Sequence, residues 1–242
     1  MRLTDLLGAH LVDRDGTDVG KVRDVWLIQD GPPIGPFGAA LRVDRLVIGR
    51  FGLGSRLGYE RPFITGPWPL AWYFHRRHGG RGAVSWSDVA AIEPGRVRLR
   101  VAADRLERPR SVQDHHESSA ARVLSAGLEL LDRQLVDPDG RMAGKVDDLE
   151  LRTRDGGPPI VTAILAGPGA LAKRLGGRPG AWLASVQARL RPEDRDGPAR
   201  ISFGVVAAIG NHVDVTAGRE DLDTYAFEGW VRDRIISKLP GS

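Results

Sequence analysis

The chain has 242 residues, of which 41% are hydrophobic and 27% charged, and its formal net charge is +4. This composition is that of a folded globular protein and excludes wholesale disorder, and the length suits two small domains better than one. The absence of cysteine excludes disulfides, thiolate metal sites and cysteine nucleophiles. The sequence shows neither a signal-peptide pattern nor an apolar run long enough to span a bilayer, so we expect a cytoplasmic protein.

The first half of the sequence is repeated in the second half. Residues 6–16 and 130–140 share their Leu-Leu, Leu-Val-Asp and Asp-Gly positions at a constant offset of 124. Three further pairs of blocks follow in the same order: residues 20–25 with 144–149, 30–34 with 155–160, and 84–92 with 201–209. This order indicates a tandem duplication, and the long period makes each copy a domain rather than one unit of a solenoid.

Each copy has the pattern of short β-strands joined by turns. Asp15-Gly16 and Pro138-Asp139-Gly140 predict hairpin turns closed by a left-handed glycine. In the strand that follows, buried-type residues are three apart, so we expect a β-bulge near Asp24 and Asp148. Alternating strands are predicted around residues 41–43, 97–101, 161–165 and 213–215. Many short strands with few helices predict small antiparallel β-barrels, and the fold class is therefore all-β.

A polar, proline-containing stretch separates the two copies, and a helical pattern follows the second. We place the first domain at residues 1–104, the linker at 105–122, the second domain at 123–218 and a C-terminal α-helix at 219–242. Apolar residues recur at helical spacing in this last segment, and Pro240-Gly241 ends it.

The repeated pattern resembles the PRC-barrel family. The first copy carries the family's features at these positions: Leu7-Gly8, Val12-Asp13, Asp15-Gly16, Gly20-Lys21-Val22, Asp24-Val25 and Trp86-Ser87-Asp88-Val89. The second copy has Leu131-Asp132 in place of Leu-Gly and Phe203 in place of the tryptophan. The resemblance implies two PRC-type barrels in tandem, in pseudo-twofold arrangement, and a docking role without catalytic residues or a cofactor.

Two functional classes within this family do not transfer to the chain. One caps the photosynthetic reaction centre and has a membrane helix before its barrel. The other is a ribosome maturation factor with an RNA-oriented domain before its barrel. The sequence has neither feature, so the resemblance implies only docking onto a protein partner or larger assembly.

Three motifs resemble chemical sites but have the wrong spacing. Residues 16–21 and 140–145 miss the phosphate-loop spacing by one residue, and valine follows the lysine where a hydroxyl would be needed for magnesium. The Asp-rich turns lack the distant glutamate of a calcium loop. His115 and His116 are adjacent rather than at the helical spacing of a zinc site. We therefore predict no metal, no cofactor and no catalytic residue.

Residues 61–77 form the strongest candidate site, because five aromatic side chains are followed there by a basic pair. These side chains either fill the end of the first barrel, or form an exposed protein interface, or contact a membrane surface or nucleic acid. The corresponding region near residues 176–190 keeps one tryptophan, which favours a specialised role for the first copy. The candidate partner-binding residues are Arg61, Phe63, Trp68, Trp72, Tyr73, Arg76 and Arg77.

Three functions remain open at this point. The first is a non-enzymatic docking or adaptor protein that binds a protein partner. The second is an RNA- or ribosome-associated factor, whose affinity would fall steeply with salt; a peripheral membrane module is a related alternative. The third is an enzyme or small-ligand binder, which requires a concave and partly polar pocket. The sequence names neither the partner nor the oligomeric state.

Overall fold

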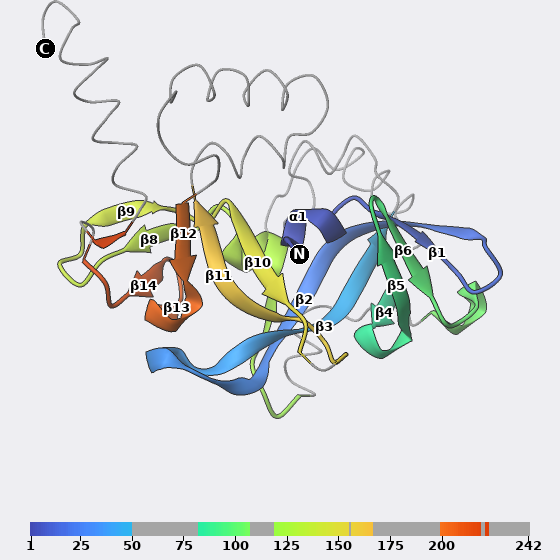
Figure 1. The fold of residues 1–242 in the computed structure, drawn as a ribbon, viewed down its shortest axis with the longest axis horizontal. Coiled ribbons are helices and arrows are strands. Elements are labelled where there is room, and N and C mark those ends of the chain that lie inside the picture. The colour runs from blue at the N-terminus through green and yellow to red at the C-terminus, as the bar shows by residue number, and fades with distance from the viewer. Residues whose placement is uncertain (50–81, 107–118, 155, 167–198, 219–220, 223–242) are drawn as a thin grey trace, which may run out of the picture. The chain divides into compact units, whose positions relative to one another are not determined.

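The computed structural model describes residues 1–49, 82–106, 119–154, 156–166, 199–218 and 221–222, and this part of the chain is mostly β-structure (Figure 1). The predicted all-β class is therefore confirmed. Within the described ranges, no helix has the length and apolar character needed to cross a membrane. The predicted helix over residues 219–242 lies outside the described residues, except for residues 221 and 222.

Most elements of the first copy have a counterpart in the second, in the same order along the chain. The first copy comprises α1 (Leu3–Leu6), β1 (His10–Val12), β2 (Asp18–Ile34), η1 (Gly35–Phe37), β3 (Gly38–Gly49), β4 (Gly82–Ser85), η2 (Trp86–Asp88), β5 (Val89–Glu93), β6 (Arg96–Leu99) and η3 (Ala103–Arg105). The second comprises β7 (Val123–Ser125), η4 (Ala126–Leu130), β8 (Gln134–Val136), β9 (Met142–Lys145), β10 (Asp148–Arg152), β11 (Ile160–Ala166), β12 (Ala199–Ser202), η5 (Phe203–Val205), β13 (Val206–Ile209) and β14 (Val213–Val215).

The strand pairing repeats along with the sequence. β1 pairs antiparallel with β2 and parallel with β6, and β8 pairs in the same two ways with β9 and β14. His10 lies opposite Lys21, and Gln134 lies opposite Lys145, so the register keeps the sequence offset of 124. In both pairs the register shifts after the second residue of the first strand. The duplication seen in the sequence is thus also a duplication of the hydrogen-bonded framework.

The turn after the first strand of each copy forms as predicted. Gly16 has a φ of 87° and Gly140 a φ of 77°, both in the left-handed region that glycine adopts without steric cost. The Asp13 carboxylate accepts hydrogen bonds from the backbone N–H groups of Asp15 and Thr17. Asp137 accepts the equivalent bonds from residues 139 and 141. These carboxylates stabilise the turn, which accounts for the Asp-rich motif.

Gly8 and Asp132 occupy equivalent positions and share one unusual backbone conformation. Their φ angles are 82° and 65°, and Asp132 is the only described residue other than glycine with a positive φ. Each donates its backbone N–H to a valine carbonyl at the same repeat position, Gly8 to Val22 and Asp132 to Val146, both at 2.8 Å. Aspartate is among the few side chains that tolerate this region, so the departure from Leu-Gly leaves the fold intact.

The apolar residues spaced by three are buried in both copies, but the second copy achieves this differently from the prediction. Val22, Val25, Val146 and Leu149 are all fully buried. In the second copy β9 ends at Lys145 and β10 begins at Asp148, and the two strands belong to different sheets. A break between two strands therefore lies just before Asp148, and the register of β10 against β11 shifts two residues beyond it, between Glu150 and Leu151. In the first copy β2 runs through the corresponding region without interruption.

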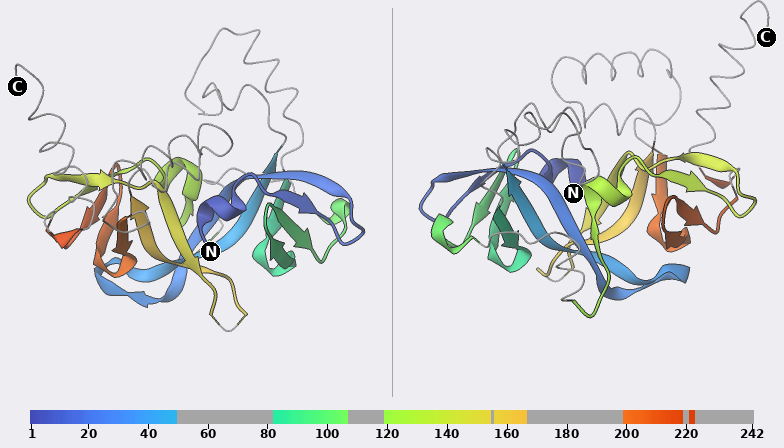
Figure 2. Two further views of the ribbon diagram at one scale, coloured as in Figure 1. Left: turned by 45° about the horizontal axis from the view of Figure 1, so that its top comes forward. Right: turned by 180° about the vertical axis from the view of Figure 1, so that it is seen from behind.

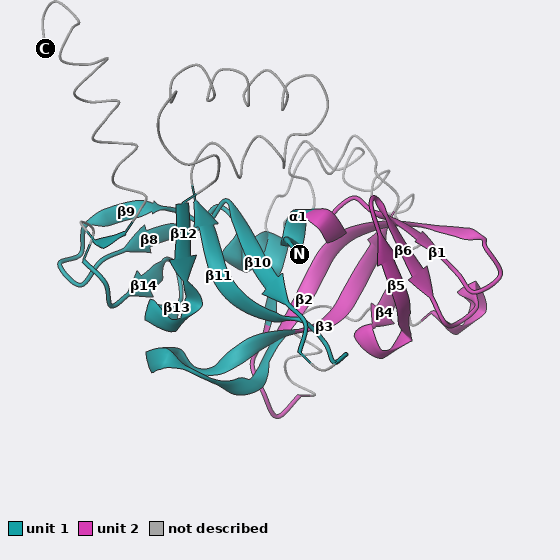
Figure 3. Ribbon diagram, in the orientation of Figure 1, with its two compact units in different colours: residues 1–4, 28–42, 124–242 teal, residues 5–27, 43–123 magenta. Residues whose placement is uncertain are grey.

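The described chain forms two compact units whose boundaries differ from the sequence repeat (Figure 3). Unit 2 contains Asp5–Leu27 and Val43–Val123, whereas unit 1 contains Met1–Thr4, Ile28–Arg42 and Leu124–Ser242. The far half of the long β2–β3 hairpin thus belongs to the unit built mainly from the second copy. Figure 2 shows β2 and β3 as continuous ribbons that run alongside each other.

Each unit has its own hydrophobic core. The fully buried side chains of unit 2 include Leu6, Leu11 and Leu46, and those of unit 1 include Leu135, Leu149 and Phe203. Within unit 2 the strands follow the order β4, β3, β2, β1, β6, β5. Unit 1 has one group in the order β10, β11, β12 and a four-stranded sheet in the order β13, β14, β8, β9.

Candidate docking surface

A stretch in the first copy has no counterpart in the second. The β3–β4 and β11–β12 registers place Ser85 opposite Arg45 and Ser202 opposite Ala163, so Arg45 and Ala163 are equivalent. Val43 then corresponds to Val161, and the preceding Ile34 matches Ile160 in sequence. Residues 35–42 are therefore an insertion in the first copy, and this insertion contains η1 and the start of β3.

Within unit 1 the inserted turn packs on η5 and β13. The ring of Phe37 meets the ring of Phe203 edge to face, with a centroid distance of 5.4 Å and an interplanar angle of 88°. Gly35 approaches the backbone of Gly204 so closely that a Cβ atom on Gly35 would overlap the Gly204 carbonyl oxygen. The close fit explains why a glycine stands at position 35.

Polar contacts within the hairpin hold this turn in place. The Gln29 side-chain amide donates to the Phe37 carbonyl oxygen at 3.1 Å. Arg42 donates two hydrogen bonds to the Asp30 carboxylate, at 2.8 and 2.6 Å, across the hairpin. The paired, planar geometry of this contact orients both strands of the hairpin.

The face of unit 2 that corresponds to this covered surface is exposed. Phe203 is fully buried, whereas Trp86 at the same repeat position is only half-buried. Ile209 is 5% exposed, whereas its equivalent Ile92 is 36% exposed. Ile92 lies opposite the fully buried Val97, so the two side chains share the inward face of the sheet. Among the described residues, Ile92 therefore marks an exposed edge of the unit 2 core rather than an ordinary outward-facing position.

An edge strand borders this exposed core. Among the described strands β5 pairs with β6 alone, and it ends the strand order of unit 2. Residues 90–93 of β5 are all exposed, whereas Val89 is buried. We call the surface formed by Trp86 and residues 90–93 the β5 face. It combines apolar side chains with a row of backbone groups able to pair with another strand.

Charges around the β5 face are mixed, with an excess of arginine. Arg96, Arg98 and Arg100 are exposed on and just beyond β6. Arg98 lies 3.7 Å from Glu93, and Asp88 is half-buried in η2. Arg96, Arg98 and Arg100 alternate with the buried Val97 and Leu99, so these arginines lie on the face of the sheet opposite to Ile92.

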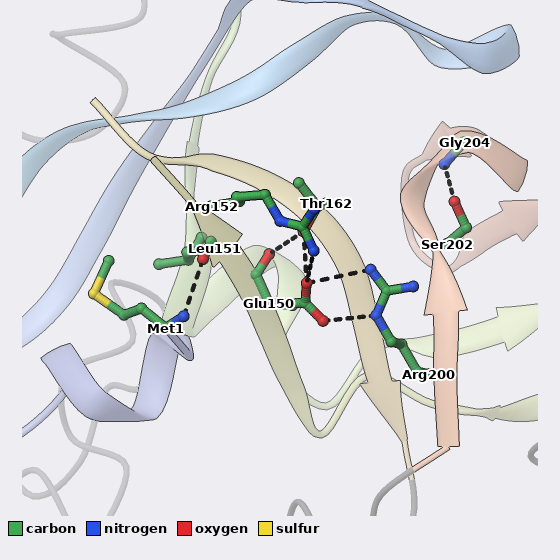
Figure 4. A network of polar contacts seen from close by, with 8 residues as sticks. All are labelled: Met1, Glu150, Leu151, Arg152, Thr162, Arg200, Ser202 and Gly204. Carbon is green, nitrogen blue, oxygen red and sulfur yellow. Dashed lines mark hydrogen bonds and ion pairs between the residues drawn. The ribbon is translucent and has the colours of Figure 1, made fainter. Parts of the chain in front are cut away.

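A carboxylate network in unit 1 is structural in character (Figure 4). Glu150 on β10 accepts hydrogen bonds from Arg200 on β12 at 2.6 and 3.2 Å, and from Thr162 on β11 at 3.2 Å. These bonds, chiefly the one from Arg200, lower the pKa of Glu150 to about 2. The same contact raises the pKa of Arg200. The ion pair ties β10 to β12 across β11.

Other described carboxylates act in the same way. The backbone N–H of Thr17 lowers the pKa of Asp13, and the hydrogen bond from His10 lowers the pKa of Asp18. The fully buried Asp148 accepts hydrogen bonds from the Thr4 hydroxyl at 2.6 Å and from the Thr4 backbone N–H at 3.1 Å. Each of these groups stabilises a turn or a helix end as a hydrogen-bond acceptor.

The site predicted at residues 61–77 lies outside the described residues, and its assignment stays a prediction. The same holds for His115 and His116 of the linker. Across the described ranges, no three metal-ligating side chains gather in one place. The β5 face was not proposed from the sequence, although Trp86 was recognised there as the closing aromatic of the repeat. The signal that could have identified it is the insertion of residues 35–42, which occurs in one copy only.

Comparison with known proteins gives no family assignment. No protein-family model matches the sequence, and no curated protein matches it either.

Proposed function

We propose that this protein is a non-enzymatic docking module, built from two PRC-type barrels in tandem, that binds a protein partner through the β5 face. The observation that carries the proposal is the difference between two equivalent surfaces. Phe203 and Ile209 are buried in unit 1, where η1 packs on their elements, whereas Trp86 and Ile92 remain accessible in unit 2.

General energetics support a binding role for this surface. Tryptophan and arginine are enriched among the residues that dominate binding energy at protein interfaces. An exposed isoleucine whose cross-strand neighbour is buried gains hydrophobic stabilisation when a partner covers it. The motif resemblance to PRC-barrel proteins, in which docking is the common theme, points in the same direction.

The test uses the full chain as bait in native lysate. Ile92→Asp should abolish capture of at least one partner, because it places a charge at the centre of the β5 face. Met142→Asp is the matched control, since Met142 is 67% exposed and lies on β9 of unit 1. Circular dichroism and thermal unfolding should show that both variants fold. Retention of every partner by Ile92→Asp would refute docking through this face.

RNA association is the second candidate, and the exposed arginines of β6 favour it. An RNA-binding surface here would lose affinity steeply as salt rises, because each neutralised phosphate releases counterions. Replacing Arg96 and Arg98 with glutamine would then weaken RNA binding and reduce its salt dependence. Salt-insensitive or absent binding of RNA to the intact chain would exclude this candidate.

A further inference from the structure

Resting on the docking function proposed above, we propose that the β5 face binds a tight turn of a partner protein that presents an aromatic side chain. The model for this ligand is the chain's own inserted turn, η1, as it packs in unit 1. The inference therefore names the chemistry of the partner, which the docking function alone does not.

The surface of unit 1 that η1 covers shows which kind of element can pack at this position. The turn Gly35–Phe37 places one ring against Phe203 and brings its backbone against Gly204. Phe37 is 9% exposed as a result, and Phe203 is fully buried. The bound element is thus a compact turn with a single aromatic contact rather than a flat strand or a helix.

The equivalent surface in unit 2 provides the matching groups. Trp86 stands where Phe203 stands, as the first residue of a 3-10 turn capped by a serine in both units. Ser85 accepts a hydrogen bond from Ser87, as Ser202 does from Gly204. Because the local backbone is the same, an aromatic ring can meet the Trp86 indole in the same edge-to-face manner.

Near Trp86, one sequence difference from unit 1 lies where a bound turn would approach unit 2, and it leaves room for that turn. Ser87 replaces Gly204, the residue against which Gly35 packs. A Cβ atom on Gly204 would meet only the Ser202 Oγ atom, at 3.4 Å, and would not reach the inserted turn. A serine at this position therefore leaves room for the close backbone approach seen in unit 1.

One further feature distinguishes the ligand expected at unit 2. Ile92 remains 36% exposed, so the aromatic group can cover it as well as Trp86. Covering both apolar groups would give a specific contact of modest area.

The experiment uses a dye-labelled cyclic peptide with the sequence of residues 28–42, titrated into the full chain and followed by fluorescence polarisation. Saturable binding is expected, and it should weaken at least ten-fold when the peptide carries Phe37→Ala or when the protein carries Ile92→Asp. Met142→Asp in the protein should leave binding unchanged.

Three results would overturn the proposal. The first is absence of binding. The second is binding that Ile92→Asp leaves unchanged, which would mean that the peptide enters unit 1 by replacing the chain's own turn. The third is an increase of ten-fold or more in affinity when the aromatic residues of 61–77 are replaced by serine, which would mean that the chain itself covers the β5 face.

The outcome is separable from that of the docking function. If the peptide fails but Ile92→Asp still abolishes capture of a partner from lysate, the β5 face docks a ligand of another shape. If Ile92→Asp leaves every partner bound, the docking function itself fails.

Discussion

Phe37 and Phe203 come from different copies of the repeat, yet their rings meet edge to face in unit 1, with centroids 5.4 Å apart. The contact exists because the first copy carries residues 35–42, an insertion that the second copy lacks. A duplicated gene product would otherwise present the same surface twice. The insertion packs on one of the two surfaces and thereby makes the copies structurally distinct.

Removing the Phe37 ring should destabilise the fold. Phe37→Ala leaves the fully buried Phe203 without its covering ring, and we expect a loss of about 2–4 kcal/mol in the free energy of unfolding. Urea denaturation of the full chain, followed by circular dichroism, measures this loss. Leu128→Ala is the control, because Leu128 is 60% exposed and should cost about 0.5 kcal/mol or less. Equal losses in the two variants would contradict a structural role for the ring.

The left-handed position shared by Gly8 and Asp132 allows a test of backbone conformation alone. A Cβ atom on Gly8 would have nothing within 4 Å, so Gly8→Ala changes only the cost of a positive φ. We expect a loss of about 1 kcal/mol, and a smaller loss for Gly8→Asp, because aspartate tolerates this region better than alanine.

The control for this prediction is Gly210→Ala. Gly210 also has open space around its Cβ position, but its φ is not positive. Its substitution should not lower the free energy of unfolding measured by chemical denaturation. If Gly8→Ala lowers the free energy of unfolding no more than Gly210→Ala does, the positive φ at position 8 is not the reason for the glycine there.

The Glu150–Arg200 pair predicts a specific dependence of stability on pH. The pKa of Glu150 falls from 4.5 to about 2 on folding, so its contribution is complete above pH 4.5 and disappears as the pH falls towards 2. Glu150→Gln should therefore cost about 1 kcal/mol at pH 7, a figure reduced for solvent screening because Arg200 is 47% exposed. The cost should approach zero near pH 2.

Denaturant titrations of both proteins at pH 7 and near pH 2 measure this difference. Glu93→Gln is the control, because Glu93 is 45% exposed and lies 3.7 Å from Arg98. Its effect should be small at both pH values. A Glu150→Gln cost that did not change with pH would assign the effect to packing rather than to ionisation.

Asp148 should be among the most sensitive polar positions of unit 1. Its carboxylate is fully buried and accepts hydrogen bonds from Thr4 and from the Leu149 backbone N–H. Asp148→Ala removes the acceptor of the buried Leu149 N–H and of the half-buried Thr4 donors, and we expect a loss of about 2–3 kcal/mol. Thr4→Val removes the hydroxyl donor and should cost about 1 kcal/mol. Thermal unfolding with both variants gives the comparison, and a smaller effect for Asp148→Ala than for Thr4→Val would contradict this account.

The sequence by itself determined the local framework of this protein. The Asp-Gly turns, the all-β class and the duplication could be predicted because they depend on residue spacing and on the conformational freedom of glycine at positions such as Gly16 and Gly140. Near Asp148 the structure has a register shift between Glu150 and Leu151, but it also has a break between β9 and β10 that was not predicted, because whether a bent strand stays in one sheet or ends depends on the strands beside it.

Only the tertiary structure decided which unit the inserted hairpin joins and which face it leaves exposed. Phe37 and Phe203 are far apart in the chain, and no local pattern says that one ring will cover the other. Ile92 and Ile209 occupy equivalent places in two similar strands, yet they are 36% and 5% exposed. Burial depends on which distant segments pack together. Because the hydrophobic effect is non-directional, a local sequence pattern does not identify the segment that will cover a given side chain.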